Sequence, residues 1–315
     1  LMLDALKVGK EHNITYLMDG KNCPGKDSEY IDYPAYAKRI DPNPRAEGFV
    51  TDENKDQYPE LGNNRVGVSM QYVGREPRFY ASVAYNGSTW YLLNEPNDAN
   101  KDKQIFYYRG GGNGYTNTMF WLRTGIGVMK FVHPDDTNRD EKEEYIRKKA
   151  EPAIRYAEIL LIYAEALNEL TGNYNIASWD EETQYTIQRN IDEMKKGIQP
   201  IRIRAGIPDY TRSEYEDQDL FREKLKRERQ IELMGEGHRY YDIRRWKDAE
   251  VEESLPIYGC NTLMTEKWRD VFHVPVAIPS LPTNFSRKMY FWPISHSELK
   301  RNKMLTQNPG WTYND

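Results

Sequence analysis

Three carboxylates in the second half of the chain have the spacing that acid–base chemistry would need. Glu228, Glu232 and Glu236 recur every four residues, so they lie along one face of the helix that this segment predicts. Two carboxyl groups that flank a glycosidic bond are the catalytic pair of most glycosidases. An arginine beside a carboxyl group lowers its pKa, which is the wrong direction for a general acid. Because arginines crowd these carboxylates, we expect buried arginine–carboxylate pairs that hold helices together, and not catalysis. The arginines are Arg227, Arg229, Arg239, Arg244 and Arg245.

The same reasoning predicts a structural charge network. A preceding helical segment opens with Arg155 and Glu158, which can pair with the arginine- and glutamate-rich helix. Removal of one partner from a buried pair would leave the other charge unpaired. The predicted members are Arg155, Glu158, Glu228, Arg229, Glu232 and Arg239.

No other motif in the chain indicates a catalytic, cofactor or metal site. The glycine-rich stretch at residues 110–114 lacks the Gly-Lys-Ser/Thr ending of a phosphate-binding loop. Asp136, Asn138 and Asp140 alternate like the start of a calcium loop, but Glu141 stands where that loop needs glycine. A solvated acidic turn is favoured there, with calcium as the alternative. The five histidines show no ligand spacing, and we expect no cofactor.

Aromatic residues favour a binding function. The chain has 24 tyrosines against 9 phenylalanines, and a tyrosine offers a flat apolar face with a polar tip, which suits sugars or peptides. Aromatic residues in or beside polar, Gly- or Asn-rich segments are the candidate ligand contacts, although each alone is more often a packing residue. The candidates are Tyr33, Tyr36, Tyr58, Tyr72, Trp90, Tyr107 and Tyr108, of which Tyr58, Tyr72 and Trp90 lead.

Composition excludes several other classes. The 315 residues carry a net charge of −5, with acids and bases interspersed, so a polyanion-binding protein is not indicated. Cys23 and Cys260 are too few for a disulfide framework or a zinc site, and their pairing is left open. No run approaches the ~20 apolar residues that span a bilayer. The chain starts LMLDALKV without a signal peptide, which indicates the cut end of a helix in a fragment.

The first 140 residues predict a loop-rich region. Prolines interrupt residues 1–64, and Asn86-Gly87 stands between two strand-like runs in residues 78–93. Both residues of an Asn-Gly pair tolerate positive φ, so the pattern predicts a β-hairpin there.

From residue 141 the pattern is helical. One helix follows Pro152 and ends near Gly172, a second covers part of residues 181–196, and a third runs over residues 219–234. We expect Gly197 and Pro200 to stop the second helix, Gly235 and Gly237 to end the third, and a short helical turn to reach Trp246. Apolar residues of the first helix recur at three- and four-residue spacing, namely Ile154, Ala157, Leu160, Leu161, Ala164 and Leu167.

These elements predict a mainly α fold. Helix pairs would form one layer, with an irregular layer and a small β-hairpin packed on it. We divide the chain into a loop-rich ligand-binding region at residues 1–140 and a helical framework at residues 141–315, within one continuous structural unit.

Several ordered segments resemble the SusD/RagB-like family of outer-membrane nutrient-binding lipoproteins. The resemblance covers residues 65–313. Its segments are EPRFYASVAYNGSTW at residues 76–90, TGIGVMKFVHPDD at 124–136, the RYAE…YAEA helix at 155–166, RAG at 204–206, RERQIELMGEGHRYYDIRRW at 227–246, and the ending FWPIS…NKMLTQNPGW.

The resemblance implies what spacing alone does not. It implies tetratricopeptide-like helix pairs, a lipid anchor on an N-terminal cysteine, a location on the outer-membrane surface and a SusC-like TonB-dependent transporter as partner. The N-terminal half of the family is missing from this chain, and Cys23 has no preceding lipobox. Gly197 and Pro200 depart from the family's unbroken helix.

The leading hypothesis is therefore a cell-surface glycan-binding subunit of a TonB-dependent uptake system. A peptide-binding lipoprotein of the same fold is the alternative, and a glycoside hydrolase or a purely structural scaffold is less favoured. The ligand itself is not specified, because ligand contacts lie in loops and in part in the missing half.

Overall fold

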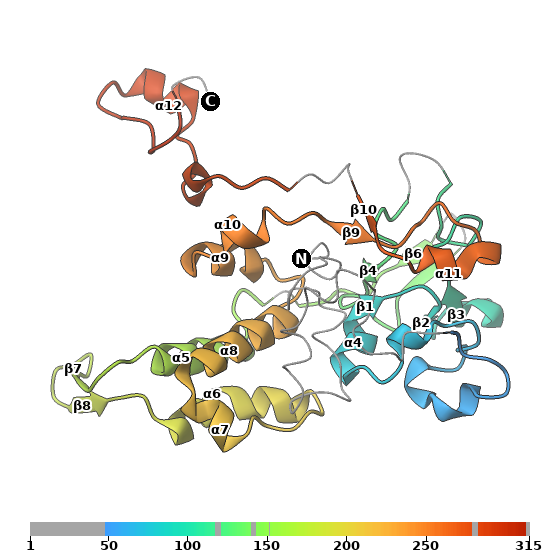
Figure 1. The fold of residues 1–315 in the computed structure, drawn as a ribbon, viewed down its shortest axis with the longest axis horizontal. Helices are drawn as coiled ribbons and strands as arrows, with labels where there is room; N and C mark the ends of the chain where they lie inside the picture. Colours follow the sequence, from blue (N-terminus) through green and yellow to red (C-terminus); the bar gives the residue numbers. More distant parts are fainter. Residues whose placement is uncertain (1–47, 117–120, 140–142, 151, 279–282, 313–315) are drawn as a thin grey trace.

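The computed structural model describes residues 48–116, 121–139, 143–150, 152–278 and 283–312. Helices dominate these residues, and the strands occur only as short antiparallel pairs, so the mainly α prediction is confirmed. Figure 1 shows a group of helices beside a loop-rich part, which comprises the described residues 48–139. The helices of the group are α5 (Tyr156–Asn168), α6 (Ile191–Arg204), α7 (Arg212–Glu216) and α8 (Gln218–Glu232).

The helical part encloses its own apolar core. Leu161 and Ala164 of α5 lie against Ile198 of α6, and Phe221 and Leu225 of α8 close the same cluster. Burial of each leucine, isoleucine or phenylalanine side chain stabilises the fold by about 1.5–3 kcal/mol. This burial explains why the three- and four-residue spacing predicted α5 and α8 close to their observed bounds.

Helix α6 covers residues 191–196 of the predicted range 181–196, as expected for a helix over part of that range, but it ends later than predicted. Asn190 caps its first turn by accepting from the backbone N–H of Glu193 at 3.1 Å. The helix then continues through Gly197 and Pro200 instead of stopping there. A proline inside a helix removes one backbone hydrogen bond. The buried side chains of α6 offset that loss by packing on α5.

Gly197 is a packing residue and not a helix stop. A Cβ atom on this glycine would lie 2.6 Å from the carbonyl oxygen of Leu160 and 2.9 Å from the Cβ of Ala164. The missing side chain therefore lets α5 and α6 approach at backbone distance.

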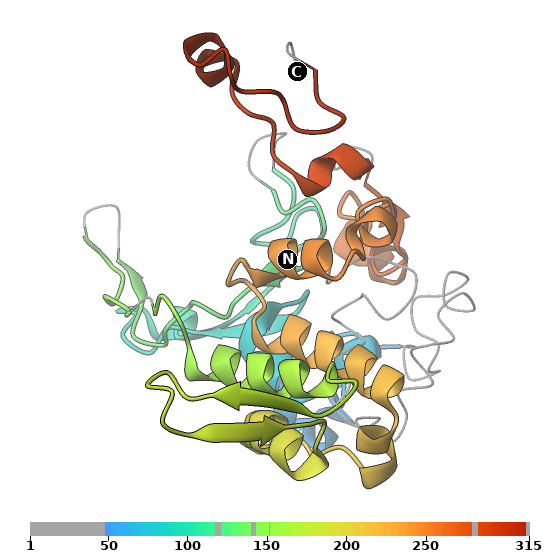
Figure 2. The ribbon, with the colours of Figure 1, turned by 90° about the vertical axis from the view of Figure 1, so that its left-hand side faces the viewer.

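Residues between α5 and α6 form a hairpin that the sequence did not predict. Its strands are β7 (Tyr174–Ala177) and β8 (Gln184–Ile187), which pair in antiparallel fashion. Figure 1 shows this hairpin projecting from the end of the helix group, and in Figure 2, viewed from that side, it lies in front. The range 181–196, part of which was predicted to be helical, therefore contains β8 before α6 begins.

The predicted hairpin around Asn86-Gly87 is also wrong. Gly87 has a φ of +88° in a tight turn, but the flanking strands pair with other segments. The side chain of Asn86 accepts from the backbone N–H of Tyr107 at 2.7 Å, and the N–H of Gly87 donates to Ile105. These bonds hold the turn against the segment that contains Ile105 and Tyr107, so β1 and β2 do not pair with each other. The elements concerned are α4 (Pro77–Ser82), β1 (Val83–Ala84) with β4 (Gly127–Val128), and β2 (Ser88–Tyr91) with β3 (Asp102–Ile105).

An aromatic core fills the loop-rich part. Tyr72 lies 4.6 Å from Tyr85 between ring centroids, and Phe79 stacks on Tyr85 at 5.3 Å. Ile231 and Met234, at the end of α8, belong to the same cluster, so the two parts share apolar contacts.

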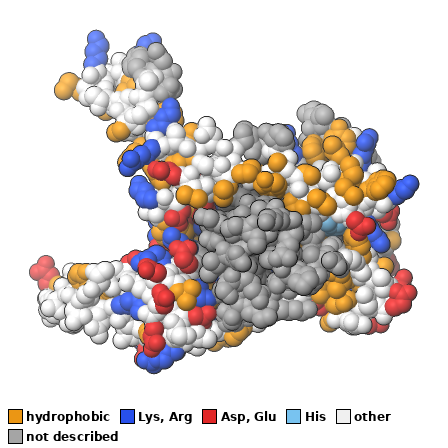
Figure 3. Space-filling view, in the orientation of Figure 1, with side chains coloured by type: hydrophobic (Ala, Val, Ile, Leu, Met, Phe, Trp, Pro, Cys, Tyr) orange, Lys and Arg blue, Asp and Glu red, His pale blue; other side chains and the backbone are white. Residues whose placement is uncertain are grey.

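The remaining elements are short, and the C-terminal segment that carries the last helix extends away from the body (Figure 1). Hydrophobic side chains gather over β9, β10 and α11 in Figure 3. No helix in the described ranges is long and apolar enough to cross a membrane. These elements are β5 (Thr137–Arg139), β6 (Glu143–Tyr145), α9 (His238–Arg245), α10 (Ala249–Glu252), β9 (Tyr258–Gly259), α11 (Arg269–Phe272), β10 (Val276–Ala277), α12 (His296–Arg301) and the 3-10 turns Lys55–Gln57, Pro59–Leu61, Met70–Tyr72, Asp98–Asn100, Glu266–Trp268 and Arg287–Tyr290.

Replacement of Gly197 by alanine should destabilise the protein. Overpacking costs about 1–3 kcal/mol, and the better helix propensity of alanine returns at most about 1 kcal/mol. We expect a net loss of about 1–2 kcal/mol in urea denaturation. The control is Gly172→Ala, because a Cβ there meets no atom within 4 Å. A higher denaturation midpoint for Gly197→Ala would contradict the close-packing role.

Candidate functional site

Three of the predicted aromatic contacts lie inside the loop-rich core. Tyr72, Tyr107 and Tyr108 are 1%, 6% and 7% exposed, so their rings offer no open face for stacking. Tyr33 and Tyr36 lie outside the described residues.

Tyr58 and Trp90 keep partial exposure. Both pack against the aromatic core, and Trp90 stands in β2 opposite Lys103 of β3. The structure thus leaves two of the three leading candidates at the surface of the loop-rich part and places Tyr72 beneath them in the core. Sequence alone could not separate these cases, because all of them stand in similar polar surroundings.

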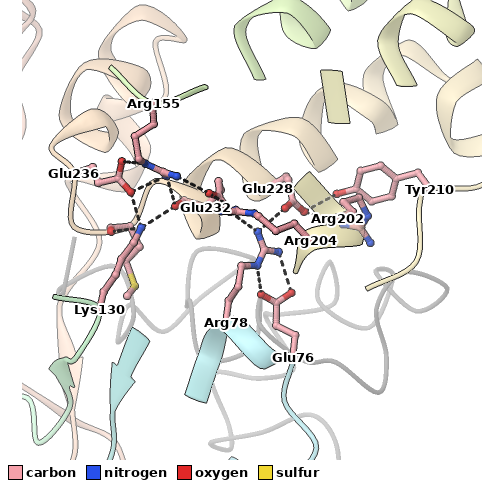
Figure 4. Close-up of polar contacts among 11 residues, drawn as sticks. Glu76, Arg78, Lys130, Arg155, Arg202, Arg204, Tyr210, Glu228, Glu232 and Glu236 are labelled. Carbon is pink, nitrogen blue, oxygen red and sulfur yellow. Dashed lines mark hydrogen bonds and ion pairs between the residues drawn. The ribbon is translucent and has the colours of Figure 1, made fainter. Parts of the chain in front are cut away.

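The carboxylates of the α8 segment are held in a continuous ion network, which Figure 4 shows. Glu228 accepts from Arg78 at 2.6 Å and from Arg202 of α6 at 2.8 Å. Arg78 also contacts Glu76 at 2.6 Å and Glu232 at 3.2 Å. One guanidinium from the loop-rich part therefore reaches carboxylates of its own part and of α8.

A second group of cations surrounds the end of α8. Arg155 contacts Glu232 at 3.0 Å and Glu236 at 2.6 Å, and Arg204 contacts Glu232 at 2.6 Å. Lys130 reaches Glu236 at 2.6 Å and also donates to the backbone carbonyl oxygens of Glu232 (2.8 Å) and Met234 (3.0 Å). Cations at the C-terminal carbonyls of a helix complement its dipole.

The structure brings only part of the predicted network together. Arg155, Glu228 and Glu232 are joined through Arg78. Three other predicted members belong to separate pairs. These pairs are Arg229 with Asp242 at 2.7 Å, Arg239 with Glu252, and Glu158 with His238 at 3.6 Å.

Five cations or acids of the network were not predicted from the sequence. Glu76, Arg78 and Lys130 come from the loop-rich part, and Arg202 and Arg204 come from α6, which continues beyond its predicted end. Their pairs connect positions up to 154 residues apart. For Glu76, Arg78 and Lys130 the sequence signal was their place inside the segments 76–90 and 124–136, which carried the family resemblance. Arg202 lies outside these segments.

The electrostatics of these carboxylates do not suit acid catalysis. Burial alone would raise the pKa of Glu228, but Arg78 and Arg202 outweigh it and hold the pKa below its ordinary value. The same balance, with Arg155 and Lys130, lowers the pKa of Glu236. Burial does raise the pKa of Glu76, yet its side chain is 1% exposed and locked to Arg78. A general acid needs a raised pKa and access to substrate.

A cavity of about 250 Å³ opens between α5 and α8. Its lining combines paired charges with an indole ring. The Trp246 ring already contacts two cations, because Arg245 lies 4.6 Å and Lys226 lies 5.3 Å from the ring centroid. Glu169 is held by Arg222 at 2.7 Å. The cavity therefore offers few unused polar groups.

In the described parts of the chain, no group of three or more His, Cys, Asp or Glu side chains could hold a metal ion. Asp136, from the calcium alternative, accepts from Lys149 at 2.6 Å and from two backbone N–H groups. Burial raises the pKa of Asp136, but these hydrogen bonds outweigh it and lower the pKa to about 2. Asp140 and Cys23 lie outside the described residues, and Cys260 is buried with its pKa raised by burial to about 12.

Comparisons with known proteins give consistent results. The model of the SusD family matches residues 11–311. SusD-like protein P2 of Formosa agariphila is 31% identical over 162 residues, which cover 50% of this chain and 25% of that protein.

Solved structures show the same fold. The selenomethionine form of BT4246 superposes with a TM-score of 0.64 at 23% identity, covering 84% of this chain and 42% of that one. A SusD-like carbohydrate-binding protein of Bacteroides fragilis superposes with a TM-score of 0.53 at 24% identity, covering 80% and 44%. The chain thus spans less than half the length of each of these relatives.

Removal of Arg78 should strongly destabilise the protein. Arg78→Ala leaves Glu76 and Glu228 with fewer partners in a buried site, which costs about 3–5 kcal/mol. The control is Arg212→Ala, whose side chain is 80% exposed in a pair with Glu216; exposed pairs contribute at most about 1 kcal/mol. Chemical denaturation measures both. Equal effects of the two substitutions would show that the network does not hold the parts together.

The network should also make stability depend on pH in acid. The folded-state pKa values of Glu228 and Glu236 lie below 4.5, so their contribution is present above that pH and is lost as the pH falls through the lower folded values. Glu76 acts in the opposite direction because its pKa is raised.

Glu236→Gln removes one of the two depressed groups. We expect its free energy of unfolding to fall less steeply than that of the wild type as the pH drops below about 4.5. Urea denaturation across a pH series measures this. Parallel curves for the two proteins would exclude the contribution of Glu236.

Proposed function

The chain belongs to the SusD family, and from this we propose that it is part of a cell-surface glycan-binding subunit of an outer-membrane nutrient uptake system. The match over residues 11–311 is the observation that carries the proposal. The partner we propose is a SusC-like TonB-dependent transporter, and we propose that a lipid anchor holds the protein at the cell surface.

The chemistry of the site supports binding instead of hydrolysis. The carboxylates that could form an acid pair are joined to arginine or lysine, and Glu228 and Glu232 are almost fully buried. Stacking of sugars needs aromatic faces and polar groups but no titrating acid. The ion network then acts as the frame on which the loop-rich part is held.

We propose that Tyr58 and Trp90 contact the glycan. Both rings keep part of their surface open above the aromatic core, in the part of the chain where loops predominate. One solved neighbour of the same fold is described as carbohydrate-binding, which agrees with a sugar as the ligand.

The test is binding of the full-length protein to a panel of purified polysaccharides, by affinity electrophoresis and then calorimetry. Trp90→Ala should weaken binding of a glycan that the wild type retains by about 1–3 kcal/mol, as expected for a stacking contact. The control is Tyr241→Ala, a substitution of a tyrosine that is 68% exposed in α9. Melting temperatures show that each variant is folded.

The outcomes separate the candidate functions. If the protein binds peptides and no glycan, peptide uptake replaces the proposal. Reducing ends released from a polysaccharide would replace it with hydrolysis. Unchanged glycan binding by Tyr58→Ala and Trp90→Ala would move the contact elsewhere in the full-length protein.

A further inference from the structure

The hairpin of β7 and β8 has one apolar face and one polar face. Tyr174 stands opposite Ile187, and Ile176 stands opposite Tyr185, so all four side chains lie on one side. Tyr174, Ile176 and Tyr185 are 45%, 46% and 52% exposed. The opposite face carries polar side chains and Ala177, with Asn175 bonded to Thr186 at 2.8 Å.

The tip of the hairpin adds an exposed indole and carboxylates. Trp179 is 95% exposed. Asp180, Glu181 and Glu182 follow it, and no lysine, arginine or histidine occurs between residues 174 and 187. In Figure 3 acidic side chains show in red at the far end of this projection.

Glu181 occupies a backbone conformation that favours glycine. Its φ is +61°, and such a conformation costs a residue with a side chain on the order of 1 kcal/mol. A glycine at this position would therefore make the turn more stable.

The apolar face contributes to no core in the described structure. None of its residues is buried, and both outer strand edges are unpaired among the described strands. A lone two-stranded hairpin is marginally stable, and an exposed apolar face with aromatic residues is typical of a protein interface. An open strand edge can also accept a further strand.

The chemistry of the hairpin selects among possible occupants. A glycan stacks on rings and would leave Ile176 and Ile187 uncovered. An anionic membrane surface repels the carboxylates of the tip. A second hairpin of the same chain would bring more acid and no base. A protein surface with apolar residues and nearby lysines or arginines complements both features.

We propose that this hairpin, residues 174–187, docks onto the outer-membrane transporter, on an apolar surface bordered by basic residues. This inference rests on the proposed function, because the transporter is the partner named there. Trp179, Tyr174 and Tyr185 supply the apolar contacts, and the carboxylates of the tip supply the charge complementarity. The docking site is separate from the glycan contacts proposed in the loop-rich part.

The experiment uses the tagged full-length protein and its transporter, purified together from native outer membranes in mild detergent. Trp179→Ala and Tyr185→Ala should each lower recovery of the transporter about tenfold or more, since exposed Trp and Tyr dominate such interfaces. The control is Gln184→Ala, on the opposite face of the same strand, which should leave recovery unchanged. Glycan binding by each purified variant should match the wild type.

A further variant separates docking from stability. Glu181→Gly relieves the positive φ and removes a charge, so it should keep or raise the melting temperature while it weakens recovery of the transporter. A weaker dependence of the complex on salt should accompany it. A structural role alone would move recovery and melting temperature in the same direction.

A photoreactive residue at position 176 identifies what the face touches. Cross-links to the transporter support the inference. Cross-links only to a second copy or to lipid overturn it, as does equal recovery of the transporter by the wild type, Trp179→Ala and Tyr185→Ala. Failure of the wild type itself to recover any transporter would instead refute the proposed function.

Discussion

The guanidinium of Arg78 between Glu76 and Glu228 is the interaction on which the arrangement of the two parts depends. All three groups are nearly or fully removed from water, where an unpaired charge costs several kcal/mol. Glu228 is in turn bound to Arg202, so the loop-rich part, α8 and α6 meet at one chain of alternating charges. Hydrophobic contacts would allow these parts to slide, whereas bidentate and shared ion pairs fix their orientation.

The sequence predicted those elements whose local pattern agrees with their tertiary role. α5 and α8 combine regular apolar spacing with flanking residues that end or cap them, and Asp217 caps α8 through backbone N–H groups of Asp219 and Leu220. α6 contradicts its local pattern, because Gly197 is used for helix contact and Pro200 is tolerated inside the helix. The Asn86-Gly87 turn forms, but a long-range hydrogen bond to Tyr107 redirects its strands.

In the candidate site too, local sequence patterns predicted some features, whereas long-range contacts determine the others. Helical spacing placed Glu228 and Glu232 on one face, and the crowding of arginines indicated pairing. Neither observation could identify Arg78 or Lys130 as partners, because a single sequence does not show which distant cation pairs with a given carboxylate. Among the aromatic candidates, burial separates Tyr72 from Trp90, and burial depends on packing that the residue types alone do not define.

The span of the network along the chain has a consequence for how the protein reaches its native state. Arg78 and Glu228 are 150 residues apart, and Lys130 and Glu236 are 106 apart. When the chain is made from its N-terminus, the loop-rich part exists before the carboxylates that complete it, and closing such long loops slows folding. Until α8 is made, Arg78 and Lys130 stay hydrated, and hydrated charges at the unfinished contact surface oppose aggregation.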